Sequence, residues 1–284
     1  MARQIRCALR RRLPRSGAAS AWRYATPLLL MLLVSGCAGR PAVPADAEAW
    51  SDAIKKKDLT SLEHMLSSNP DPDLAGGDGK TALMIAAQAG DVALVEDLIE
   101  AGADVNARSE HLGTPLMFAA TGGSVPVIRL LIDRGAQLNA VARLGWTALL
   151  LASAKGNTAA ALLLIEAGAE PNLADGYGWT PLMRALTGRH KDTVQALLDT
   201  GLMDLAAREE SGATTLHIAA GEGQADMVAA LLTAGADPAL TDSAGRTPAA
   251  VAAMMGYEEI AARLTAAEHL GPGSPRASVP TPQH

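Results

Sequence analysis

The chain has 284 residues, of which 24 are basic and 30 acidic, so its formal net charge is −6. This acidic balance argues against nucleic-acid binding, because such binding needs a surplus of lysine and arginine to neutralise phosphates. With only two cysteines, the chain also cannot be a disulfide-rich scaffold.

The first 36 residues have the organisation of a bacterial export signal. Seven arginines precede a short apolar run, residues 28–34, and small residues follow it. This run is too short to span a bilayer, which needs roughly 20 apolar residues in a helix. It ends in LVSGC, residues 33–37, which resembles the lipobox of bacterial lipoproteins. The resemblance implies cleavage before Cys37 and lipidation of that cysteine; an ordinary signal peptide with a chance cysteine is the alternative.

Loss of this signal would change the charge and the location of the chain. The resemblance to lipoproteins implies a lipid-anchored protein that faces the periplasm. In that family a second mature residue other than aspartate, here Ala38, favours the outer membrane. The mature chain would keep 17 basic and 30 acidic residues, a net charge of −13, which favours a protein partner with a basic surface. Cys7 would leave with the signal, so the folded domain would hold no thiol for catalysis or metal binding. A cytosolic protein with a later true start is the alternative.

Residues 37–49, which include two prolines, predict a lipidated tether. Residues 50–75 read as a degenerate repeat that caps the N-terminal end of the domain. Lysines at positions 55–57 would give that cap a solvated outer face.

A threonine then recurs at spacings of 33, 33, 33, 34 and 33 residues. These threonines are Thr81, Thr114, Thr147, Thr180, Thr214 and Thr247. A fixed period of this size predicts stacked supersecondary units, none of which could bury its apolar face alone.

The second unit shows how each repeat is built. Thr114 suits a helix N-cap and Pro115 the first helical position. Gly123 would break the first helix, and Gly135 suits the left-handed residue that ends the second. Between these glycines, apolar residues at helical spacing over 127–132 predict a second helix with one buried face.

The repeats resemble ankyrin repeats. The matching segments include GWTPL at 178–182, GATTLHIAA at 212–220 and GADVN at 102–106, and the likeness covers about residues 76–265. It implies an all-α solenoid of helix–turn–helix repeats with projecting hairpin loops, here five full repeats between N- and C-terminal caps. The proline-rich tail, residues 266–284, is expected to be disordered.

Three irregularities interrupt the period. Gly113 directly precedes Thr114, which alters that hairpin tip. In the fourth repeat Arg189 stands where glycine should separate the helices, and Gly188 is expected to shift the turn by one residue. The extra residue of the longer spacing should lie in the loop after Gly201 rather than in a helix.

Motifs for catalysis are missing from the sequence. It contains no glycine-rich phosphate loop, no zinc-protease motif and no nucleophile elbow, so we expect no enzyme activity, cofactor or metal. His217 occupies the histidine position of the ankyrin signature, where the resemblance implies a structural role. Met84, Met117 and Met183 are expected in the core. Met254 and Met255 are expected in the core or under the cap, with a second contact site as the alternative.

The resemblance implies that hairpin tips and the concave face of the inner helices hold partners. The predicted partner-binding residues are Glu110, His111, Arg143, Trp146, Lys155, Tyr177 and Trp179, and Leu144 maps to the same edge. Large exposed aromatics often anchor interfaces, but a tryptophan before the threonine can instead pack over the next hairpin. Both possibilities stay open for Trp146 and Trp179.

The sequence therefore predicts a monomeric protein that mediates protein–protein interaction, as a scaffold or assembly factor for an envelope protein. A periplasmic neutralising partner of a toxin is an alternative. An alternative of another class is an envelope enzyme or cofactor carrier with a hidden site, for which the groove offers mainly Lys155 and Glu222 as ionisable groups.

Overall fold

The computed structural model describes residues 45–67 and 71–270. The predicted signal, Cys37, most of the tether and residues 271–284 lie outside the described residues. Both ends of the folded region extend further than predicted. Helix α1 includes the last five tether residues, and α14 takes in the first five tail residues, because both segments are rich in alanine and glutamate, which favour helix.

The described region consists of α-helices and one 3-10 turn, with no strand among its residues. The helices are α1 (Ala45–Lys56), α2 (Leu59–Leu66), α3 (Ala82–Ala89), α4 (Val92–Glu100), α5 (Pro115–Gly122), α6 (Val125–Asp133), α7 (Ala148–Lys155), α8 (Thr158–Glu166), α9 (Pro181–Thr187), α10 (Lys191–Asp199), α11 (Thr215–Gly221), α12 (Ala225–Thr233), α13 (Pro248–Met254) and α14 (Glu258–Leu270). The 3-10 turn η1 spans Arg143–Gly145. Within this region no helix is both long and apolar enough to cross a membrane.

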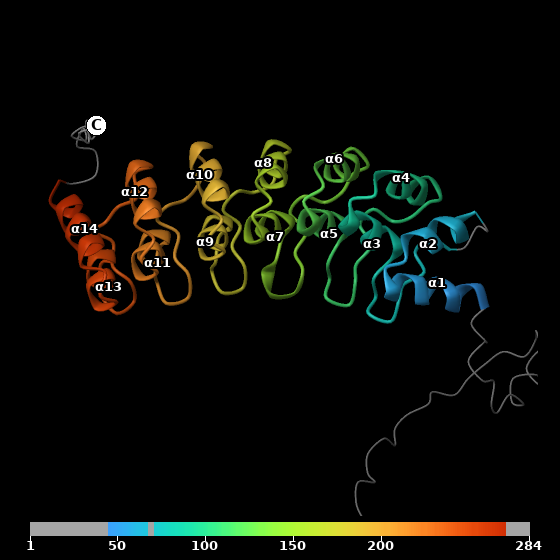
Figure 1. Cartoon of the computed structure of the whole chain (residues 1–284), viewed down its shortest axis with the longest axis horizontal. Helices are drawn as coiled ribbons and strands as arrows, with labels where there is room; N and C mark the ends of the chain where they lie inside the picture. The colour runs from blue at the N-terminus through green and yellow to red at the C-terminus, as the bar shows by residue number, and fades with distance from the viewer. Residues whose placement is uncertain (1–44, 68–70, 271–284) are drawn as a thin grey trace, which may run out of the picture. The chain divides into compact units, whose positions relative to one another are not determined.

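Consecutive helices form seven antiparallel pairs, so five full repeats stand between two capping pairs, as predicted. The inner helices α3, α5, α7, α9, α11 and α13 contact one another in sequence along the solenoid. The outer helices α4, α6, α8, α10 and α12 form a second row, and the hairpin loops project from the opposite edge (Figure 1). This arrangement confirms the all-α solenoid.

Threonine caps start the inner helices. The hydroxyls of Thr81, Thr147, Thr180 and Thr247 each accept a hydrogen bond from the backbone N–H three residues on, at 3.2–3.4 Å. These bonds satisfy N–H groups that the helix itself leaves without a partner. The Thr214 N–H instead donates to Nδ1 of His217 at 3.2 Å, and His217 Nε2 lies 3.0 Å from the Arg246 carbonyl. His217 is therefore structural, as predicted.

Small alanines on the inner helices and leucines on the outer helices form the core. Met84, Met117 and Met183 are buried within it, as predicted. The expectation for Met254 and Met255 is wrong, because these side chains are 63% and 56% exposed. Met254 ends the last inner helix, α13, and Met255 is its C-cap; the Met255 position is exposed in internal repeats as well, at Ala89, Gly122 and Lys155.

The irregular positions keep the repeat geometry. Arg189 itself adopts the left-handed conformation, with φ 58°, whereas Gly188 is right-handed, so the expected one-residue shift of the turn is wrong. The inserted residue lies in a loop, as predicted. The same hydrogen bond joins successive repeats at this loop, and its span locates the insertion. Asn139 Oδ1 accepts from the N–H of Glu170, 31 residues further on, whereas Asn172 Oδ1 accepts from the N–H of Asp204, 32 residues further on. The insertion is thus confined to the segment between Gly201 and Asp204.

Candidate functional site

Each hairpin is tied to the next by a backbone hydrogen bond. In every pair, the residue three before the capping threonine accepts from the N–H of the next hairpin. The acceptor–donor pairs are Asp78–Glu110 (3.3 Å), His111–Arg143 (3.0 Å), Leu144–Gly176 (2.7 Å), Tyr177–Glu210 (3.0 Å) and Ser211–Ser243 (3.0 Å). These bonds fix the hairpin tips before any partner arrives, which lowers the ordering cost of binding.

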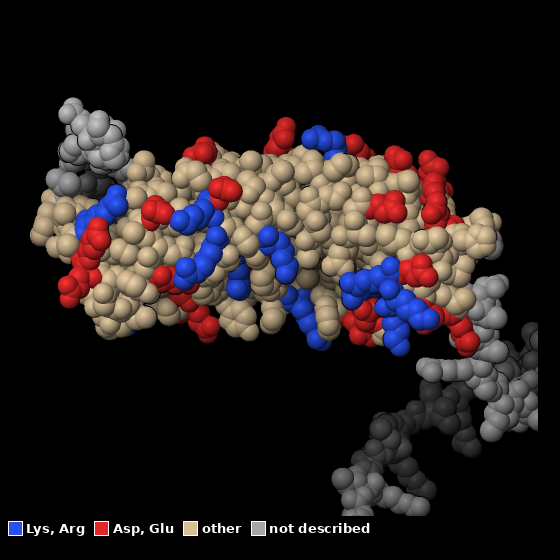
Figure 2. All heavy atoms as spheres, in the orientation of Figure 1, with Lys and Arg blue, Asp and Glu red and all other residues tan. Residues whose placement is uncertain are grey.

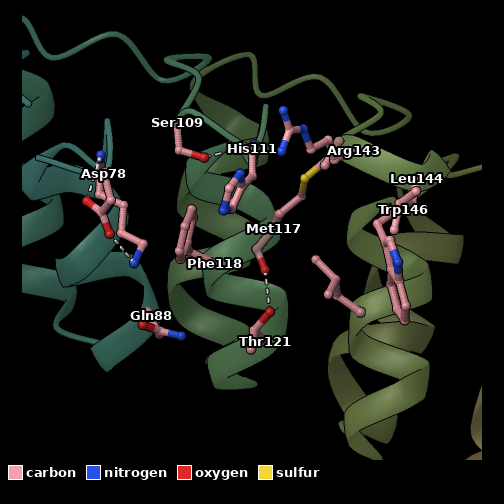
Figure 3. A pocket seen from close by; sticks show the side chains of 14 residues that line it. Asp78, Gln88, Ser109, His111, Met117, Phe118, Thr121, Arg143, Leu144 and Trp146 are labelled. Atoms are coloured by element: carbon pink, nitrogen blue, oxygen red, sulfur yellow. Dashed lines mark hydrogen bonds and ion pairs between the residues drawn. The ribbon is translucent and has the colours of Figure 1, made fainter.

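A groove of about 560 Å³ lies along the first three hairpins and their inner helices. Phe118 of α5 and Trp146 stand on opposite sides of it, with Met117 between them (Figure 3). His111 and Arg143 lie at the end of the groove nearest the hairpin tips (Figure 3). The remaining lining residues are Asp78, Lys80, Gln88, Ser109, Gly113, Thr121, Ala142, Leu144 and Leu151. The arrangement is an apolar slot with a polar rim.

Lys80 and Asp78 form one wall of the groove. Lys80 Nζ lies 2.6 Å from Asp78 Oδ2 and 5.9 Å from the centroid of the Phe118 ring. The hydrogen bond from Lys80 holds the pKa of Asp78 below its usual range, so this carboxylate stays charged at neutral pH. Lys80 therefore binds both an anion and an aromatic face, and its aliphatic chain lines the slot.

The two hairpin tryptophans stack on one arginine. Arg184 Cζ of α9 lies 4.7 Å from the Trp146 ring centroid and 5.0 Å from that of Trp179. Arg184 also donates to Oδ2 of Asp175 through Nε at 2.9 Å, and the Asp175 side chain is completely buried. The backbone N–H groups of Tyr177 and Trp179 donate to its other oxygen at 2.9 and 3.1 Å. Because Asp175 holds Arg184 in place, Arg184 in turn fixes the position of the Trp146 ring at the edge of the groove.

The structure divides the predicted binding residues into two groups. His111, Arg143 and Trp146 line the groove together, and Leu144 lines it as well. The others lie outside it: Glu110, Lys155 and Tyr177 are exposed on neighbouring segments, and Trp179 is half-buried against Arg184.

Sequence reasoning missed Phe118, Lys80 and Arg184. Phe118, Leu151 and Arg184 occupy the same position in successive repeats, four residues after the capping threonine, and all three are half-buried. Comparing that position across the repeats, where a phenylalanine and an arginine replace the usual aliphatic residue, is the signal that could have found Phe118 and Arg184; it does not reach Lys80, which directly precedes Thr81.

Two leucines beside the groove have left-handed backbones. Leu112 has φ 61° and Leu144 φ 59°, and their side chains are 45% and 59% exposed. The five other hairpins carry glycine at the position of Leu112. A side chain in this conformation costs roughly 1–2 kcal/mol, and such strain is concentrated at functional sites. The strain here places apolar side chains in solvent at the hairpin tips.

The charges of the domain are unevenly distributed. On the face shown in Figure 2, most lysine and arginine side chains lie in the lower half, over the inner helices and hairpins, with acidic side chains among them. Acidic side chains predominate along the upper edge, over the outer helices. The prediction of a basic partner used only the net charge, which does not describe the groove side.

Comparison with known proteins agrees with this architecture. A family model for ankyrin repeats matches residues 50–142, 84–175, 139–205 and 202–271. The chain belongs to the ankyrin-repeat family. Its fold is similar to the crystal structure of the human ASB11 ankyrin repeat domain, with a TM-score of 0.66 and 22% identity, over 80% of this chain and 99% of that one. At this identity the likeness shows the fold alone. A search of curated proteins finds no match.

Ankyrin repeats indicate a protein–protein interaction scaffold, and such proteins are generally non-enzymatic. Lys155 ends α7 and Glu222 caps the C-terminus of α11, two repeats further on, and Glu222 accepts a hydrogen bond from Gln224 at 2.7 Å. Across residues 45–67 and 71–270, no group of three or more His, Cys, Asp or Glu side chains is placed to hold a metal ion.

Proposed function

We propose that this ankyrin-repeat protein binds another protein through the groove formed by its first three hairpins. The observation that carries the proposal is the exposed apolar slot between Phe118 and Trp146, with Leu144 at its rim. Half-buried aromatics on a rigid frame are the residues that most often dominate interface energies. The chain acts as a monomeric, non-enzymatic scaffold for an envelope protein.

The same proposal places the protein in the cell envelope. Its support is the arginine-rich, apolar N-terminal segment and the lipobox-like LVSGC at residues 33–37. Lipid on Cys37 then anchors the chain, and the groove faces the periplasm at the outer membrane. Labelling of the full chain with radioactive palmitate tests this step: the wild type should incorporate label, and the Cys37→Ala variant should not. Equal labelling of both would refute the lipid anchor and would leave the proposed groove unaffected.

A neutralising role against a toxin is the second candidate. It is favoured by the preorganised hairpins, since a rigid surface suits tight occlusion of an active site. A toxin gene next to this gene would support it, whereas a neighbouring exported enzyme would support the scaffold.

The groove is tested by crosslinking pull-down with the full chain solubilised from membranes. We compare wild type with Leu144→Ala/Trp146→Ala and with a matched control, Leu202→Ala, a leucine that is 53% exposed on a loop outside the groove. The groove variant should lose a specific partner that wild type and control retain. Helical circular dichroism checks that each variant folds. A folded groove variant that keeps every partner refutes the proposed site.

A further inference from the structure

The groove combines an apolar slot with a basic surrounding, although the chain as a whole is acidic. We infer that its partner presents an acidic segment with a large apolar side chain, which enters the slot while carboxylates contact the surrounding basic groups. This inference rests on the proposed function and names the class of partner.

The slot defines the apolar part of the partner. Phe118 and Trp146 are its walls, Met117 lies between them, and Leu151 is half-buried beside Trp146. A cavity of about 560 Å³ accommodates a large side chain together with the backbone on either side of it. The exposed Leu144 extends the apolar contact towards the hairpin tips.

Basic groups approach the slot from several repeats. Arg143 lines it directly and is exposed. Lys155 is exposed one helical turn beyond Leu151 on α7. From the other side, Lys57 Nζ donates to Gln88 Oε1, a lining residue, at 3.4 Å. Within the described part of the chain, none of these three cations has a carboxylate partner in an ion pair.

The carboxylates near the groove are fewer and mostly paired. Asp78 is paired with Lys80, and Asp175 with Arg184. Glu110 is exposed on the second hairpin and does not line the groove. A binding segment therefore meets a local excess of positive charge.

The acidic surplus lies elsewhere and is screened. Outer helix α4 alone carries Glu96, Asp97 and Glu100. Interactions between exposed charges fall off over about 8 Å at physiological ionic strength. A segment bound in the groove thus interacts mainly with the basic rim, and its acidic groups are favoured over basic ones.

A random-peptide display selection against the immobilised full chain tests the inference. Enriched peptides are synthesised, and their affinity is measured by fluorescence anisotropy for wild type and for Arg143→Glu/Lys155→Glu. The matched control is Arg129→Glu/Arg134→Glu, which changes the net charge equally at two exposed positions of α6 and its C-cap.

We expect the enriched peptides to carry aspartate or glutamate around one large apolar residue. The groove reversal should weaken them roughly tenfold or more, the control less than about threefold, and added salt should weaken wild-type binding. Peptides that need Leu144 and Trp146 but are neutral or basic would overturn the acidic partner and leave the proposed groove intact. If no enriched peptide is weakened by Leu144→Ala/Trp146→Ala, the groove itself is refuted, and the inference with it.

Discussion

Replacing Arg189 by glycine should make the protein more stable. Arg189 lies between α9 and α10 with φ 58°, and its backbone N–H donates to the Leu186 carbonyl at 2.9 Å. In the five other helix pairs between α3 and α14, the corresponding turn has a glycine with φ between 70° and 83°. These are Gly90, Gly123, Gly156, Gly223 and Gly256. The turn geometry is thus compatible with glycine and strained for arginine.

The size of the effect follows from two opposing terms. Removing a Cβ from the left-handed region relieves roughly 1–2 kcal/mol of strain. Glycine has more freedom in the unfolded chain, which lowers the free energy of unfolding by roughly 0.5–1 kcal/mol. The Arg189 side chain is exposed and forms no ion pair with the described residues, so little packing is lost. The net gain is about 0.5–1 kcal/mol.

Urea unfolding followed by helical circular dichroism measures this difference. Arg189→Ala is the matched control, because it removes the charge and keeps the Cβ, and it should show no gain. The reverse change, Gly156→Ala, should lose about 2 kcal/mol or more, since φ is 73° and a Cβ would lie 2.5 Å from the His190 ring. If Arg189→Gly is no more stable than Arg189→Ala, backbone strain does not explain the turn.

Three further results are expected. In Gly145→Ala, a Cβ would lie 2.6 Å from a backbone nitrogen of the next hairpin, whereas in Gly168→Ala the nearest atom is 4.0 Å away. The free energy of unfolding in urea should therefore fall more for Gly145→Ala than for Gly168→Ala. Equal losses would contradict close hairpin packing. Burial lowers the pKa of His217, so its neutral form is favoured in the fold and the stability it contributes is lost as pH falls below about 6.5. Between pH 7 and pH 5, the melting temperature should therefore fall less for His217→Gln than for the wild type. An equal fall for both would refute this. Asp175→Asn breaks the buried pair with Arg184 and should cost roughly 3 kcal/mol in urea unfolding, with a change in tryptophan fluorescence; an unperturbed fluorescence spectrum would count against the stacked network.

Much of the fold was predictable because each repeat is locally encoded. The capping threonine, the first-turn proline and the turn glycines act within a few residues of each other, so they can be identified without tertiary contacts. The same locality explains why the sequence places Arg143 and Trp146 on one hairpin, since the position of that hairpin follows directly from the period.

The errors arose where a residue's surroundings depend on a neighbouring repeat. Met254 and Met255 have apolar side chains, yet their exposure is set by where the end of α13 lies in the stack, and the Met255 position is exposed in internal repeats too. Arg189 keeps the turn in register because the stacked helices on both sides impose the left-handed backbone on it. Neither outcome follows from local propensity.

By itself, the sequence determined the ankyrin solenoid and its five repeats between two caps. Only the tertiary structure decided which side chains meet along the hairpin edge. Phe118 and Trp146 belong to different repeats and face each other because stacking places α5 beside α7. Stacking also brings basic residues of several repeats to one face while the acidic surplus lies over the outer helices, so the charge that a partner meets is a property of the assembled surface rather than of the composition.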